Sequence, residues 1–249
     1  MHLEHFFTYE TTIPQGIGFG MFHLGHFIWI ALIVLGIILG IKWYRRTNTK
    51  RKRILEIVTA GSLILWIVFR AIYIAVIHEK FLYELPLHLC SMAGILCAIH
   101  CVAQWQWLGQ VLYSLCLPGA ILALLFPNWS FYPAIHFLTL EAFLFHMGIV
   151  LYVFLMLDSH KIIPKVQKAW QVVVFMFAVV IPIYFFDKKY DVNYMFVNRP
   201  SAGSPLVWLE HWLGDPGYLV GYAILMILCI IFMDLGYMLF TGKRTVRKE

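Results

Sequence analysis

A cysteine in an apolar segment and three histidines are the residues of this sequence that could form a covalent catalytic pair. Cys90 ends the segment Glu84-Leu-Pro-Leu-His-Leu-Cys90. A free thiol has a pKa of about 8.5, so it needs a nearby base or cation to become a thiolate nucleophile. His88 is two residues from Cys90 and points to another side of the same predicted helix. The remaining candidate bases are His136 and His146, both on a later helix.

Depth in the membrane distinguishes these two histidines. At about 1.5 Å of rise per residue, His146 lies roughly 18 Å below Ala134, whereas Cys90 lies roughly 9 Å below Glu84. Spacing alone therefore slightly favours His136 as the base, and a pair of Cys90 with His146 requires a tilted or later-starting helix. Buried cysteines are common and usually inert, so simple packing is the alternative for Cys90.

Ionisable residues inside apolar segments are the other unusual feature. Such residues usually face the interior of a helix bundle and mark either a site or a buried pair. Arg70 is expected to pair with Glu84 or Glu141, or else to hold a phosphate. Glu141 is five residues from both His136 and His146 and so faces away from them. We expect four polar residues to be interfacial because they lie near predicted membrane edges: His23, His26, His100 and Asp234.

The elements that must position these residues are membrane-spanning helices. The chain has 249 residues, of which 61% are hydrophobic and 13% charged, and its mean hydropathy is +0.78. This is too little polar surface for a soluble globule. A span needs roughly 20 apolar residues, and continuous runs of that length predict an all-α bundle in a single integral membrane domain, residues 1–249. Seven spans are predicted: Met21–Ile41, Ile54–Ile77, Leu85–Ala103, Leu108–Phe126, Ala134–Leu157, Ala169–Phe186 and Gly217–Phe240.

The distribution of Lys and Arg predicts the orientation of the bundle. Fourteen of these residues fall in 42–53, 161–168 and 243–248, against four in the connections on the opposite side. The positive-inside rule then places the N-terminus outside and the C-terminus in the cytoplasm. The net charge of +6 is explained by this topology and by anionic lipid headgroups, so no nucleic-acid partner is expected. No nucleotide or metal motif occurs, and we predict neither cofactor nor metal.

The longest connection, residues 187–216, lies on the predicted outer side. A connection of this length is often functional. Asn193 and Arg199 in its first half could join Arg70 in binding a headgroup phosphate or a carbonyl oxygen. Its second half, residues 206–213, is apolar with two tryptophans and predicts a short interfacial helix.

Four features in this order resemble a known family. They are Leu85-Pro-Leu-His-Leu-Cys90, the run PGAILALLFP at 118–127, His146, and NYMFVNRP at 193–200. Together they resemble the YwaF-like bacterial membrane proteins, relatives of transmembrane protein 164 of animals. The resemblance implies a lysophospholipid acyltransferase of the bacterial plasma membrane.

The resemblance also implies roles for particular residues. The catalytic cysteine and histidine of the family map onto Cys90 and His146, which favours His146 over His136 as the base. The partner is then a membrane phospholipid or lysophospholipid. One thioester-forming site could serve transfer or hydrolysis, depending on whether water is excluded at the second step. Substrate-binding candidates are Arg70, His88, His136, Glu141, Asn193 and Arg199.

Two non-enzymatic interpretations remain open from the residues. One is a seven-helix transporter or receptor, for which Pro118, Gly119 and Pro182 would be the helix breaks. The other is a haem protein with axial ligands from His88 and His136. The sequence does not fix the oligomeric state.

Overall fold

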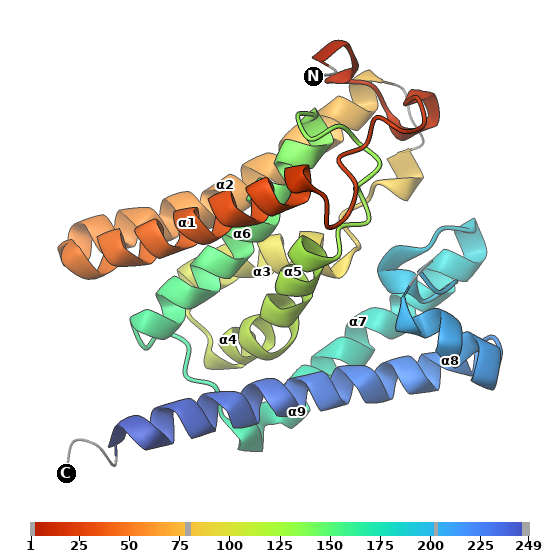
Figure 1. Cartoon of the computed structure of the whole chain (residues 1–249). Helices are drawn as coiled ribbons and strands as arrows, with labels where there is room; N and C mark the ends of the chain where they lie inside the picture. The colour runs from red at the N-terminus through yellow and green to blue at the C-terminus, as the bar shows by residue number, and fades with distance from the viewer. Residues whose placement is uncertain (1–2, 78–80, 202–203, 246–249) are drawn as a thin grey trace.

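The computed structural model describes residues 3–77, 81–201 and 204–245, and in these ranges the regular secondary structure is helical, without any β-strand. The chain runs through nine α-helices in the described ranges, joined by short 3-10 and π segments (Figure 1). Their bounds are α1 (Leu24–Arg46), α2 (Thr49–Val76), α3 (Leu89–Ala103), α4 (Gln106–Val111), α5 (Leu117–Leu125), α6 (Phe137–Asp158), α7 (Ala169–Tyr190), α8 (Pro205–Leu213) and α9 (Tyr218–Thr245).

Six helical stretches in the described ranges are long and apolar enough to cross a membrane, against the seven predicted from sequence. The exception is the predicted span Leu85–Ala103. Its helix, α3, has only 15 residues, which at about 1.5 Å each is shorter than a hydrocarbon core of about 30 Å. Pro86 disfavours helical backbone at the residue before it, and the chain enters the bundle here in an irregular segment.

Side chains and local turns satisfy the backbone of this irregular segment. The Leu85 amide donates to the Tyr194 hydroxyl, and that hydroxyl donates to the Leu82 carbonyl oxygen at 2.5 Å. Burial raises the pKa of Tyr194 to about 12, so the hydroxyl keeps its proton and remains a donor. Non-helical backbone within a membrane bundle is tolerated where protein buries it and satisfies its polar groups.

Helix α6 is the centre of the bundle. It packs against α1, α2, α3 and α5, whereas α7 and α9 lie on the far side of α3–α5 and contact each other (Figure 1). Helix α8 confirms the short helix predicted within residues 206–213, and it packs against α9.

The basic connections gather at one end of the bundle, where α1 meets α2, α6 meets α7 and α9 ends (Figure 1). We call this the C-terminal end and the opposite one the N-terminal end. Glu56, buried near the start of α2, accepts bonds from Lys161 at 2.6 and 2.7 Å and from the Tyr44 hydroxyl at 2.7 Å. Arg45 pairs with Asp158 at 2.6 Å. These contacts tie the three connected helices together.

The prediction of interfacial positions was wrong for three of the four polar residues to which it applied. His26, His100 and Asp234 are buried, and only His23 is exposed. His26 bonds to the Leu124 carbonyl oxygen at 2.9 Å, and His100 bonds to the Tyr152 hydroxyl at 2.9 Å. Each links two helices.

Asp234 joins α9 to an irregular turn. It accepts bonds from Ser114 at 2.6 Å and from Gln110 at 2.8 Å. Ser114 lies in a π-helical turn, η4 (Leu112–Cys116), which ends two residues before Pro118. Because Pro118 has no amide hydrogen for the carbonyl one turn earlier, the wider turn accommodates it.

Candidate functional site

A partly buried ion-pair network lies toward the N-terminal end of the bundle. Arg70 of α2 donates through Nε and Nη2 to Glu84 Oε2 at 3.0 and 2.7 Å, and through Nη1 to Glu141 Oε2 of α6 at 3.1 Å. The Tyr9 hydroxyl donates to the other Glu84 oxygen at 2.8 Å. The predicted ion pair is therefore confirmed, with both carboxylates rather than one. This ion-pair network holds Glu84 at the same depth in the bundle as Arg70 and Glu141. The chain therefore begins α3 from a point inside the bundle.

His136 is the N-cap of α6. Its Nδ1 accepts a bond from the Leu138 amide at 3.0 Å, and its Nε2 donates to the Thr8 carbonyl oxygen at 2.8 Å. The ring also stacks on Tyr132 with centroids 4.3 Å apart, and the side chain is fully buried. Both ring nitrogens are thus engaged with backbone, and neither is available to a thiol or to a metal.

His88, Asn193 and Arg199 meet at the loop after α7. The His88 Nδ1 accepts a bond of 3.4 Å from the Met195 amide, and its ring lies edge-on to Tyr194. Asn193 accepts bonds from two later amides in the loop and donates to the Arg199 carbonyl oxygen at 3.0 Å. The Arg199 guanidinium pairs with Asp191. These contacts fold the loop into a wall over the start of α3.

Two contacts fix how α3 and α6 lie beside each other. A Cβ added to Gly94 would come within 2.7 Å of the Phe145 ring, and His100 bonds to Tyr152. Both pairs have nearly the same sequence offset, which shows that the helices run parallel. That offset places Cys90 beside Glu141, and the thiol and the Glu141 carboxylate are within electrostatic range of each other.

His146 lies one to two turns further along α6, roughly 7 Å deeper than Glu141. Its Nδ1 bonds to the Ala142 carbonyl oxygen at 2.6 Å. A carbonyl only accepts, so Nδ1 carries the hydrogen and Nε2 carries the lone pair. Nε2 makes no hydrogen bond to any residue that the structure describes. The bond to Ala142 also directs the ring toward the start of α6, which is the depth at which Cys90 lies.

Cys90 and His146 are not hydrogen-bonded to each other in this structure. The thiol is half-buried at the start of α3, within electrostatic range of Cys116 and of Tyr222 on α9. His146 is buried with 7% of its surface accessible, and its ring stacks on Trp129. Because Cys90 lies beside Glu141 in the register of α3 and α6, His146 lies roughly 7 Å deeper than Cys90, close to the roughly 9 Å expected from sequence. Catalytic hydrogen bonds often tighten only when substrate is bound.

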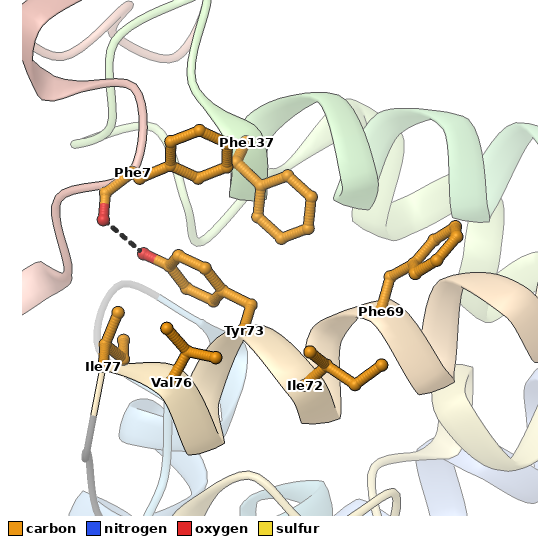
Figure 2. A pocket seen from close by; sticks show the side chains of 7 residues that line it. All are labelled: Phe7, Phe69, Ile72, Tyr73, Val76, Ile77 and Phe137. Atoms are coloured by element: carbon orange, nitrogen blue, oxygen red, sulfur yellow. Dashed lines mark hydrogen bonds between the residues drawn. The ribbon is translucent and has the colours of Figure 1, made fainter.

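An apolar groove of about 490 Å³ lies between the last turns of α2 and the start of α6 (Figure 2). In Figure 2 the Tyr73 hydroxyl bonds to the Phe7 carbonyl oxygen across it, at 3.1 Å. Phe137, on its wall, is nine residues from His146 and therefore on the opposite side of α6. The groove is thus separate from the Cys90 and His146 region. Its lining consists of Phe7, Phe69, Ile72, Tyr73, Val76, Ile77 and Phe137.

The chain matches the TMEM164 family over residues 19–234, which is most of its length. It belongs to the TMEM164 family. As a TMEM164 family protein with several long apolar helices, it is an integral, multi-pass membrane protein. None of the curated proteins and none of the solved structures compared with it matches.

Two residues of the Cys90 and His146 region of this TMEM164 family protein were absent from the sequence-based assignment. Trp129, which follows the predicted span Leu108–Phe126, stacks on His146. Tyr194 was only part of a loop motif, yet it holds the entry to α3. Aromatic residues are so frequent in this chain, at 17%, that composition does not single out either one.

Proposed function

We propose that this TMEM164 family protein transfers acyl groups between membrane lipids through Cys90 as nucleophile and His146 as base. The observation that carries the proposal is the hydrogen bond from His146 Nδ1 to Ala142, which leaves the Nε2 lone pair free in the α3 and α6 region that holds the thiol. A base in this tautomer is what a neighbouring thiol requires. The family resemblance of the Cys90 segment supports the same pair.

The reaction proceeds in two steps. His146 Nε2 takes the Cys90 proton while the sulfur attacks the carbonyl carbon of a phospholipid ester, and the carbonyl π electrons move to its oxygen. The tetrahedral intermediate collapses to a thioester, and the departing lipid alkoxide takes the proton from His146. In the second step His146 deprotonates a lysophospholipid hydroxyl, which attacks the thioester; the carbon–sulfur bond breaks, and the departing Cys90 thiolate takes the proton back from His146. Water in place of that hydroxyl gives hydrolysis.

The ion-pair network supports the site by holding its helices. Arg70 donates through Nε and both terminal nitrogens to Glu84 and Glu141. These engaged donors disfavour a lipid phosphate as a further partner. We therefore propose that Arg70 and Glu141 position α3 against α6.

The other predicted substrate-binding residues divide into two groups. His136 caps α6, and its engaged nitrogens also weaken the haem alternative with His88. We propose that His88, Asn193 and Arg199 line the path by which a headgroup reaches Cys90, because they lie over the start of α3.

The test is acylation of the purified protein in lipid bilayers by a fluorescent phospholipid with a labelled acyl chain. We expect label on Cys90, released by neutral hydroxylamine as a thioester would be. Cys90→Ala abolishes it and His146→Ala slows it strongly. Cys116→Ala, a neighbouring thiol, is the matched control and retains labelling. Absence of label on Cys90, or labelling that is equally fast without His146, would refute the proposal.

A further inference from the structure

Trp129 carries a buried N–H group that has no partner among the described residues. Its Nε1 is inaccessible and makes no hydrogen bond to any described residue. Buried tryptophan N–H groups usually find an acceptor, because leaving the group desolvated and unpaired is unfavourable. By contrast, the nearby Trp29 donates its Nε1 hydrogen to the Ala134 carbonyl oxygen at 3.0 Å. Packing alone therefore does not explain why the Trp129 N–H group is buried without an acceptor among the described residues.

The position of Trp129 connects this donor to His146. The indole lies in the connection between α5 and α6, and it stacks on the imidazole with centroids 5.2 Å apart and planes inclined by 19°. It also meets the Phe143 ring edge-on at 5.5 Å. Phe143 is fully buried, so the indole contacts both the base and a rigid core residue. A phenyl ring would give the same stacking without burying an unpaired N–H group.

We propose that the Trp129 indole N–H donates a hydrogen bond to the oxyanion that forms when Cys90 attacks an acyl ester. This inference rests on the proposed function and adds a catalytic residue to it. As the carbon–sulfur bond forms, the carbonyl π electrons move onto oxygen, which becomes negative beside His146. A fixed donor in a water-poor site stabilises that charge without reorganisation. When the intermediate collapses, the oxygen returns to a carbonyl and the leaving alkoxide takes the proton from His146.

Two reactions of the same thiol separate this role from a structural one. Acylation of Cys90 develops an oxyanion, whereas alkylation by iodoacetamide is a direct displacement at carbon and develops none. Both reactions require the thiolate that His146 generates. A residue that only orients His146 affects both rates, and a donor to the oxyanion affects acylation alone.

The experiment compares the two rates at Cys90 in the full-length protein in bilayers, for wild type, Trp129→Phe, Trp29→Phe and His146→Ala. For Trp129→Phe we expect acylation slower by about 10²- to 10³-fold, the usual effect of losing one oxyanion donor, and an unchanged alkylation rate. The unchanged alkylation rate also reports that the variant is folded. Trp29→Phe, the matched loss of an indole N–H in the same cluster, keeps both rates.

Three outcomes would overturn the inference. Equal slowing of both reactions in Trp129→Phe assigns Trp129 to packing or to orientation of His146. Unchanged acylation in that variant shows that its N–H is not used. If wild-type Cys90 is not acylated at all, the proposed function fails together with the inference, whereas the first two outcomes leave the function intact.

Discussion

The Nδ1 atom of His146 lies 2.6 Å from the carbonyl oxygen of Ala142, one turn earlier in the same helix. Within a helix this carbonyl already accepts a backbone amide, so the imidazole takes its second lone pair. The bond fixes both the tautomer and the direction of the ring. His136 shows the opposite arrangement, because both of its nitrogens are engaged with backbone groups.

Replacing each histidine separately distinguishes the two candidate bases. His146→Ala should slow acylation of Cys90 by about 10²- to 10⁴-fold, as expected for a lost general base. His136→Ala should leave the acylation rate near that of wild type and lower stability by about 1 kcal/mol through loss of the α6 cap. Single-turnover labelling and melting temperatures measure the two effects. Slow acylation in a folded His136→Ala variant would reverse the assignment.

Removing the cation from the ion-pair network should destabilise the bundle. Arg70→Met leaves Glu84 and Glu141 without their partner, at a cost of about 3 kcal/mol, the lower end for a buried pair. We choose the lower end because 34% of the Arg70 side chain is accessible. Adding Glu141→Gln to Arg70→Met should recover part of the loss, since one buried charge is then removed. Melting temperatures in detergent test this, and a double variant no more stable than the single one would contradict it.

The close approach of α3 and α6 should tolerate no side chain at Gly94. A Cβ there would lie 2.7 Å from Phe145 Cζ, and Phe145 is itself buried. Gly94→Ala should therefore cost about 1 to 3 kcal/mol and slow acylation, because Cys90 lies one turn away on the same face of α3. Gly61→Ala in α2 is the control, since a Cβ there meets no atom within 4 Å. That variant should be as stable as wild type or up to about 1 kcal/mol more stable.

The orientation of the chain can be tested with C-terminal fusions. Because fourteen basic residues lie on one side and four on the other, we expect the C-terminus in the cytoplasm. Green fluorescent protein fused there should fluoresce, whereas alkaline phosphatase fused there should remain inactive. The reverse pattern would invert the topology and place the start of α3 on the cytoplasmic side.

The sequence by itself determined that the chain is a helical membrane protein. Run length and hydropathy are local properties, and the bilayer imposes a minimum length on each span, so six of the predicted spans correspond to long apolar helices. The third did not, because Pro86 and the ion pair of Glu84 hold the entry to α3 in a non-helical conformation. The Arg70 pairing was also predictable, since a charge in an apolar helix requires a counter-charge.

Only the tertiary structure decided which polar groups meet. The sequence placed His136 and His146 on one helix with equal chemistry. Their roles diverged because Thr8 and Leu138 bond to the two ring nitrogens of His136, whereas Ala142 is the one described residue that bonds to His146. Contacts of this kind depend on the axial register and rotation of packed helices, which close approaches such as that of Gly94 and Phe145 set. Hydrophobic periodicity carries no information on register between helices, so the stacking of Trp129 on His146 emerges only once the chain is folded.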